Sequence, residues 1–229
     1  MAYVGGKSKC YNHIVNVLND PKYDNKKYLE PFVGMAHILR RVVNKKQYFA
    51  GDINENLYTL LRGVQNGEQY PYISKKRYDI LRNTPASFEK SLAAFTYSYN
   101  GKEFGGYTRT DRDKTRNYPQ ERIRYYELLK QNETFMTTRL KNCAYNKWRP
   151  SGYLIYCDPP YLDTTDYSTN FNHPLFWDTM REWSKNNTVF ISEYTAPRDF
   201  KVVSKSTKYM SLSGSGSSEK RTEKLFQLA

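Results

Sequence analysis

One predicted strand that must end abruptly constrains this chain most. The run Gly152–Cys157 is apolar and aromatic, which is typical of a strand buried in a sheet. Asp158, Pro159, Pro160 and Tyr161 follow it directly. Two prolines cannot extend a strand ladder, because they lack N–H groups and have a fixed φ. The chain therefore has to make a rigid turn there, with an acid and an aromatic ring at the carboxyl end of a buried strand.

The first sixty residues alternate between strand-like and helix-like segments. The expected elements are a helix over 7–19, a strand over 28–32, a helix over 38–43, a strand over 48–52 and a helix through 57–61 capped by Asn54. Later segments resume the alternation, with strands expected at 134–139, 152–157, 188–192, 200–204 and 224–228 and a helix over 174–184. This pattern predicts an α/β fold built on a doubly wound sheet.

The middle of the chain does not alternate. Residues 66–132 predict helices near 75–82, 86–98 and 119–131, with a basic hairpin or ordered loop near 100–117. We therefore expect residues 1–65 and 133–229 to form one catalytic domain, and 66–132 to form a mainly helical insertion into it. The Gly/Ser-rich run 211–218 is expected to be a mobile loop.

The charge of the chain points to a polyanionic partner. The formal net charge is +13, and between Leu60 and Pro150 18 Lys and Arg face 9 Asp and Glu, so 18 − 9 = +9 of it lies there. Lysine and arginine gain affinity for nucleic acids by releasing counterions from phosphates. A generally basic surface is the alternative, but the concentration in one segment favours a region that contacts nucleic acid.

The remaining composition excludes several classes. Three cysteines form no CxxC pair and no metal-ligand cluster, which indicates reduced thiols in a cytosol-like compartment and no metal site. No apolar run is long enough to span a membrane. We therefore expect a cytoplasmic protein of a bacterial or virus-infected cell. Its oligomeric state cannot be inferred from the sequence.

The segment from Glu30 to Asp52 has the pattern of a cofactor site. Ligands of doubly wound sheets bind at the carboxyl ends of strands. Gly34, in the first turn, allows a ligand to approach the backbone, and Asp52, at the end of the second strand, can accept hydrogen bonds from ribose hydroxyls. A tight turn with a helix-capping aspartate would explain the same residues, because there is no complete GxGxxG motif.

The Asp158–Tyr161 turn suits chemistry on a planar amino group. Such a group is a poor nucleophile while its lone pair is conjugated with a ring. A carboxylate and a backbone carbonyl that accept its hydrogens would draw the lone pair out of conjugation, and the neighbouring ring can stack on the base. A plain Pro-Pro turn closing a strand is the alternative, which the coincidence of acid, prolines and aromatic ring disfavours.

Two further segments are candidates for binding. Near the N-terminus, Gly-Gly in Tyr3–Lys7 allows close backbone approach, and Lys7 can pair with a carboxylate or phosphate. The basic loop combines polar and aromatic side chains on a glycine-rich frame, and its basic and amide groups suit base edges in the major groove. The predicted nucleic-acid contacts are Asn100, Lys102, Tyr107, Arg109, Arg112 and Arg116.

Taken in order, these motifs resemble the Dam-type family of adenine-specific DNA methyltransferases. The resemblance rests on Tyr3-Val4-Gly5-Gly6-Lys7, Glu30-Pro31-Phe32-Val33-Gly34, Asp52-Ile53-Asn54, Tyr99-Asn100-Gly101, Asp158-Pro159-Pro160-Tyr161 and Ser192-Glu193-Tyr194. It implies a Rossmann-like fold, with S-adenosylmethionine as cofactor and double-stranded DNA as partner. It further implies methyl transfer to the exocyclic amino group of an adenine flipped out of the duplex.

The resemblance also assigns roles by position. The implied cofactor-binding residues are Tyr3, Lys7, Glu30, Phe32, Val33, Gly34, Asp52, Ile53 and Asp158, and the implied catalytic residues are Asp158, Pro159, Pro160 and Tyr161. Two positions depart from the family pattern: Ala36 replaces a second glycine in the cofactor loop, and Tyr3 replaces a more usual tryptophan.

Alternatives to this interpretation stay open. The Asp-Pro-Pro-Tyr motif also occurs in methyltransferases that act on RNA bases or on glutamine side chains. A relative that binds DNA without catalysis is a further possibility, although intact Asp52 and Asp158 argue against it. A methyltransferase paired with a restriction endonuclease would differ only in its biology. The recognition sequence cannot be read from the chain.

Overall fold

The computed structural model describes residues 11–108, 117–161, 171–211 and 218–229. Within them, seven strands form one mixed sheet in the order β3-β2-β1-β4-β5-β7-β6. The first five strands along the chain are parallel, whereas β7 runs antiparallel to both β5 and β6. The strands are β1 (Lys27–Glu30), β2 (Gln47–Asp52), β3 (Arg139–Asn142), β4 (Tyr153–Cys157), β5 (Thr188–Glu193), β6 (Phe200–Ser211) and β7 (Ser218–Leu228).

The strand order contains a switch point between β1 and β4. From β1 the chain builds β2 and β3 outward on one side, and it then returns to place β4 and β5 on the other side. In doubly wound sheets, ligands bind outside the carboxyl ends of the strands at such a point. Here β1 ends at Glu30, and the neighbouring β4 leads directly into Asp158.

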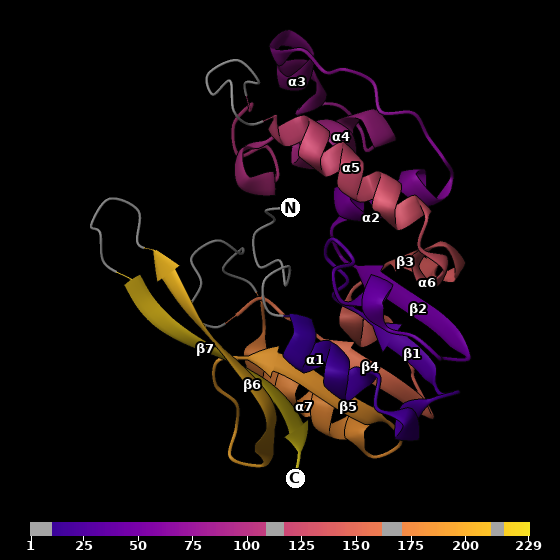
Figure 1. Ribbon diagram of the computed structural model, residues 1–229, viewed down its shortest axis with the longest axis vertical. Helices are drawn as coiled ribbons and strands as arrows, with labels where there is room; N and C mark the ends of the chain where they lie inside the picture. Colours follow the sequence, from indigo (N-terminus) through magenta and orange to yellow (C-terminus); the bar gives the residue numbers. More distant parts are fainter. Residues whose placement is uncertain (1–10, 109–116, 162–170, 212–217) are drawn as a thin grey trace.

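The helices fall into two groups (Figure 1). Helices α3, α4 and α5 stand apart from the sheet, and α2 lies between them and β2. Helices α1 and α7 lie against the sheet. The helices are α1 (Tyr11–Leu18), α2 (Glu55–Gln65), α3 (Lys75–Leu81), α4 (Phe88–Thr96), α5 (Tyr118–Lys130), α6 (Glu133–Thr137) and α7 (His173–Ser184). None of those in the described ranges is both long and apolar enough to cross a bilayer.

The sheet separates two hydrophobic clusters. On β4, Leu154 and Tyr156 belong to the larger cluster, whereas Ile155 and Cys157 belong to a smaller one with Met180 of α7. Successive side chains on a strand point to opposite faces, so a strand covered on both sides is apolar throughout. This burial on both faces explains the continuous apolar run seen in the sequence.

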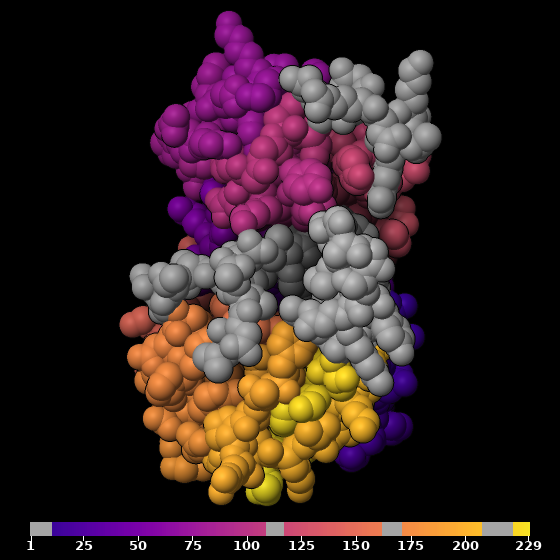
Figure 2. Space-filling model, turned by 90° about the vertical axis from the view of Figure 1, so that its left-hand side faces the viewer, coloured from indigo at the N-terminus to yellow at the C-terminus, as the bar shows by residue number. Residues whose placement is uncertain are grey.

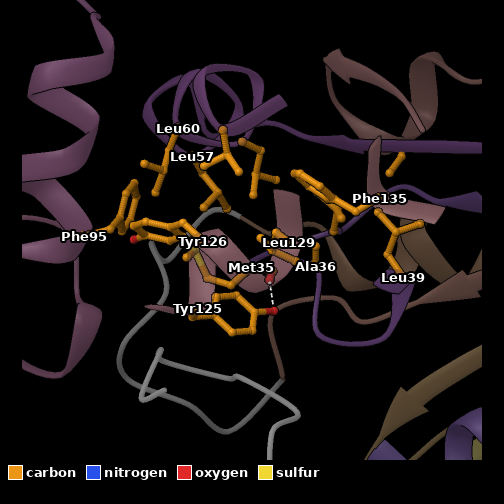
Figure 3. Close-up of a cluster of buried hydrophobic side chains, with 14 of the residues drawn as sticks. Met35, Ala36, Leu39, Leu57, Leu60, Phe95, Tyr125, Tyr126, Leu129 and Phe135 are labelled. Atoms are coloured by element: carbon orange, nitrogen blue, oxygen red, sulfur yellow. Dashed lines mark hydrogen bonds between the residues drawn. The ribbon is translucent and has the colours of Figure 1, made fainter. Parts of the chain in front are cut away.

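The helical insertion shares the larger cluster with the sheet domain (Figure 3). Tyr126 of α5 lies among the same buried side chains as Leu57 of α2 and Ala36 of the turn after β1. The Tyr125 hydroxyl also donates a hydrogen bond of 2.7 Å to the carbonyl of Met35. The insertion is therefore packed directly against the segment that follows β1.

The expected helix over 38–43 is wrong. After β1 the chain makes turns, and only a single 3₁₀ turn, η2 (Leu39–Arg41), follows. The positive φ values of Gly34 (50°) and Ala36 (55°) prevent a helix from starting earlier, and Val42, inside the expected helix, is extended with φ −81° and ψ 126°. The apolar spacing at 38–43 reflects burial of an irregular segment.

The expected strand over 134–139 is also misplaced. Residues 133–137 form α6, and β3 begins only at Arg139. Asn132 caps α6, because its side chain accepts a hydrogen bond of 2.9 Å from the Phe135 backbone N–H. Asparagine followed by a glutamate in the first turn is an N-terminal helix signal. The sequence contains that signal, but the β-branched and aromatic side chains that follow it favoured the prediction of a strand.

The other expected elements are found, with shifted ends. The predicted strands 200–204 and 224–228 belong to a much longer hairpin of β6 and β7, which extends beyond the sheet (Figure 1). Its polar, alternating outer part carried no strong apolar signal, so its length was underestimated. Of the loop expected at 211–218, residues 212–217 lie outside the described ranges.

Candidate active site

The turn after β4 brings the acid and the ring of the Asp158–Tyr161 segment to the switch point. Asp158 is half-buried and Pro159 is buried. The Tyr161 hydroxyl donates a hydrogen bond of 3.0 Å to Glu223 Oε1 on β7, and its ring meets Tyr194 edge-on with centroids 4.8 Å apart. The ring of Tyr161 is thus held by contacts from two other parts of the sheet.

Burial and charge keep this tyrosine neutral. Desolvation raises the pKa of Tyr161 well above its usual value, and the negative charges of Asp158 and Glu223 raise it further. The pKa of Tyr156, which lies on β4 five residues before Tyr161, is raised for the same reasons. Tyr161 is therefore a hydrogen-bond donor at physiological pH and has no tendency to act as a base.

The turn after β1 is built on a buried acid. Glu30 is 2% exposed, and its Oε2 accepts a hydrogen bond of 2.8 Å from the Tyr28 hydroxyl. Val33 donates its backbone N–H to the carbonyl of Gly51 at 2.9 Å, which ties the turn to the end of β2. Gly34 then takes its left-handed conformation beside Asp52.

Asp52 organises the end of β2. Its two carboxylate oxygens accept backbone N–H groups from Gly34 at 3.2 Å and from Asn54 at 3.0 Å. Desolvation nevertheless raises the pKa of Asp52, and these backbone hydrogen bonds only partly oppose the effect. Buried acids whose pKa is raised by desolvation are common at ligand-binding positions.

Ile53 lies beside this acid with an unusual exposure. Its side chain is 72% exposed, although it directly follows a central strand. An exposed apolar side chain next to a carboxylate suits a ligand that combines a planar ring with hydroxyl groups. The flexible turn at Gly34, the acceptor Asp52 and the exposed apolar side chain of Ile53 therefore fit a nucleoside such as that of S-adenosylmethionine.

Phe32 lies among several other aromatic rings. Its half-buried ring stacks on Tyr145 with centroids 5.2 Å apart, and it also meets Phe171 and Phe176 edge-on. Phe32 thus anchors the turn in the smaller hydrophobic cluster. Val33, the next residue, is 4% exposed and belongs to the larger cluster.

Sequence reasoning missed several residues of this site. Asn142, at the end of β3, donates its side-chain amide to the carbonyls of Asp52 at 2.9 Å and of Ile53 at 3.2 Å. Tyr194 and Glu223 contact Tyr161, as described above. Asn142 and Glu223 carry no local motif, and the Ser192–Tyr194 motif gave Tyr194 no role in the site. The strand order brings all three residues to the same edge.

The basic loop contains both exposed and packed side chains. Asn100 and Lys102 are exposed, and Asn100 has a positive φ of 52°. The Tyr107 hydroxyl, by contrast, donates a hydrogen bond of 2.8 Å to the carbonyl of Ile73, and its ring stacks on Tyr97. Tyr107 therefore supports the loop, while Asn100 and Lys102 lie on its surface.

The loop is also hydrogen-bonded to the start of α2, which follows Asp52 and Ile53. Glu103 accepts side-chain amide hydrogen bonds of 2.6 Å from Asn54 and from Asn56 at the start of α2. Asn54 at the same time caps α2. Five predicted site residues lie outside the described ranges: Tyr3, Lys7, Arg109, Arg112 and Arg116.

The strand order gives the described sheet a Rossmann-like topology, and the family comparison supports an S-adenosylmethionine-dependent methyltransferase. Residues 3–86 match the model of the D12 class N6 adenine-specific DNA methyltransferase family. This confirms the resemblance over the segment that contains the Glu30–Gly34 turn and Asp52. The Asp158–Tyr161 turn lies outside the matched residues.

Comparison with solved structures finds several methyltransferases at low sequence identity. The rRNA methyltransferase aviRa from Streptomyces viridochromogenes is 11% identical, with a TM-score of 0.42 over 99% of this chain and 88% of that one. The yhhF protein of Escherichia coli is 10% identical, with a TM-score of 0.42 over 95% and 85%. A precorrin-6y C5,15-methyltransferase from Geobacter metallireducens is 8% identical, with a TM-score of 0.39 over 93% and 87%. No curated protein matches the sequence.

Proposed function

We propose that this methyltransferase acts on the exocyclic amino group of adenine in duplex DNA, after the base has been flipped out of the helix. The observation that carries the proposal is the position of the Asp158–Tyr161 turn. It lies at the switch point, beside the β1 and β2 ends that carry Glu30 and Asp52. The family match supports adenine as the target, and the basic insertion supports DNA.

The residues at the carboxyl ends of β1 and β2, which we call the cofactor side of the site, are proposed to divide the binding task. Asp52 is proposed to accept ribose hydroxyls, Ile53 to pack on an adenine ring, and Gly34 to let the ligand approach the backbone; the exposure of Ile53 and the positive φ of Gly34 support these roles. S-adenosylmethionine supplies an electrophilic methyl group on a sulfonium centre. The buried carboxylate of Glu30 adds negative potential to the edge of the sheet that would face this cation.

The residues of the turn after β4, which we call the target side of the site, would make the amino group more nucleophilic. Asp158 and the Pro159 carbonyl are proposed to accept its two hydrogens, so that the nitrogen lone pair leaves conjugation and faces the methyl group. Tyr161 is proposed to stack on the flipped base. Transfer needs no covalent enzyme intermediate, so the protein acts chiefly by positioning.

The insertion 66–132 is proposed to read and grip the DNA. Asn100 and Lys102 are exposed on its loop, and Arg109, Arg112 and Arg116 continue the basic sequence. Because Glu103 ties this loop to the start of α2, base contacts and cofactor contacts would share one rigid frame.

One experiment tests substrate, activity and site together. Mixed-sequence duplex DNA is incubated with the protein and S-adenosylmethionine, and modified adenines are mapped by long-read sequencing. A parallel reaction contains RNA of the same sequences, and Asp158→Ala is the inactive control. Methyl groups on DNA adenines support the proposal, whereas incorporation only into RNA, or none with bound cofactor, would contradict it.

A further inference from the structure

The hairpin of β6 and β7 reaches the candidate active site through one carboxylate. Glu223 of β7 is 6% exposed, and its Oε1 accepts the Tyr161 hydroxyl at 3.0 Å. The strand that carries it lies between β5 and β6, so Glu223 arrives from a segment more than sixty residues beyond the Asp158–Tyr161 turn. Nothing in the local sequence around Glu223 marks it as a site residue.

Glu223 is an acid in a buried place beside the candidate active site. Burying a charged group costs free energy unless hydrogen bonds compensate for it. Glu223 also lies close enough to Tyr161 to raise its pKa, as do Asp158 and Glu193, so several acids crowd around one ring. Like charges in a partly desolvated place repel one another. A buried carboxylate that accepts the hydroxyl of a proposed site residue is therefore a candidate for a role in that site.

The geometry shows what that function requires. A tyrosine ring has only two torsions, and a hydrogen bond at its tip restricts both. The Glu223 carboxylate fixes the hydroxyl, and the edge-on contact with Tyr194 fixes one side of the ring. A hydrogen bond to a charged acceptor is stronger than one between neutral groups. The plane of the Tyr161 ring is therefore set before any base arrives.

We infer that Glu223 is a positioning residue that orients Tyr161 for stacking on the target base, an inference that rests on the proposed function. It acts through Tyr161 and touches neither substrate nor cofactor. It also makes the C-terminal hairpin part of the target side of the site. Misplacing a stacking group by about 1 Å can lower the rate of transfer by up to about 100-fold.

The test is a double-mutant cycle on Glu223 and Tyr161. Glu223→Ala, Tyr161→Phe and the double variant are compared in single-turnover methylation of adenine-containing DNA at saturating cofactor and DNA. A second duplex, with 2-aminopurine in place of the target adenine, reports the flipped and stacked base by its fluorescence. We expect each single variant to lose on the order of 10-fold in rate, and the double variant to lose no more than the worse single one. Cofactor affinity, measured by calorimetry, should not change.

Two further variants separate positioning from folding. Glu223→Gln keeps a side-chain oxygen that accepts the Tyr161 hydroxyl, so it should stay within about threefold of the wild-type rate. Thr222→Ala removes the neighbouring hydrogen bond to Thr207 on the same hairpin, and it should leave rate and 2-aminopurine signal unchanged. Thermal denaturation identifies any variant that does not fold.

The outcomes distinguish this inference from the proposed function. If the wild-type protein methylates DNA adenines but Glu223→Ala has the wild-type rate, or if the two losses multiply, the positioning role is wrong. If the wild-type protein transfers no methyl group to DNA, the proposed function fails. In that case the same four proteins are compared by their thermal stabilities. A double-mutant cycle on those stabilities measures whether the two side chains are coupled, and absence of coupling would overturn the inference by itself.

Discussion

The cofactor side and the target side of this site are assembled in different ways. On the cofactor side, Glu30, Gly34, Asp52 and Ile53 lie within one segment of fewer than twenty-five residues that contains β1 and β2, and Gly34 donates its backbone N–H to Asp52. On the target side, the Asp158–Tyr161 turn depends on contacts from β5 and β7. The first arrangement is local, while the second exists only when the sheet is complete.

This difference has a consequence for robustness. Local hydrogen bonds between Gly34 and Asp52 form whenever β1 and β2 pair. The orientation of Tyr161 additionally needs β7 to insert between β5 and β6. Changes on the cofactor side should therefore act mainly on ligand affinity, whereas changes on the target side should act mainly on the rate of transfer.

Asp158→Ala should have the largest effect. It removes the proposed acceptor of the amino hydrogens, and loss of one such preorganised group lowers rates by about 10²–10³-fold. DNA affinity, measured by fluorescence anisotropy, should change little because the basic insertion is intact. Asp178→Ala, at an exposed ion pair on α7, is the control. Activity within a few-fold of wild type would mean that Asp158 has no catalytic role.

Asp52→Asn should act on cofactor affinity and, with the opposite sign, on stability. Losing charge-assisted hydrogen bonds to a ribose should weaken cofactor binding by about 10–100-fold, measured by calorimetry. The folded-state pKa of Asp52 is raised, so its ionisation costs stability above the unfolded-state pKa, and this cost disappears as the pH falls below that value.

The same variant gives a pH test of that sign. Compared with Asp52→Asn, the wild-type protein should lose stability as the pH rises from about 3 to about 7, over the range in which aspartate ionises. The difference between the two melting temperatures, recorded across that range, is the measurement. A difference that does not change with pH, or that changes in the other direction, would show that burial does not raise the pKa of Asp52.

How far the site could be predicted from the sequence follows from the same comparison. Asp52, Gly34 and the Asp158–Tyr161 turn were found because each is a compact motif at the end of a strand. Asn142 and Glu223 were missed, and Tyr194 was quoted only as part of the Ser192–Tyr194 motif, because the contacts of these residues depend on which strands become neighbours. The helix expected over 38–43 was wrong because buried irregular backbone and an amphipathic helix can share the same apolar spacing.

Lys102→Ala tests the insertion, which is attached to the cofactor side through Glu103. Removing one exposed charge near phosphate should weaken DNA binding a few-fold and reduce the slope of log affinity against log salt by about 0.9. The rate at saturating DNA should not change. Lys185→Ala, at an exposed ion pair with Glu182 at the end of α7, is the matched control. Equal salt slopes for wild type and Lys102→Ala would remove this lysine from the DNA contact surface.

Ala36→Gly should have the smallest effect, and it examines the departure from the family pattern. Ala36 is fully buried and has a φ of 55°, a conformation that costs about 1–2 kcal/mol for a residue with a Cβ. Glycine relieves that strain but adds about 0.5–1 kcal/mol of backbone entropy in the unfolded chain. The free energy of unfolding, measured with urea, should therefore rise by at most about 1 kcal/mol. Ala36→Val, which adds a branched side chain at the same φ, should be clearly destabilising. If valine is tolerated as well as glycine, the turn after β1 does not have the conformation on which the cofactor side depends.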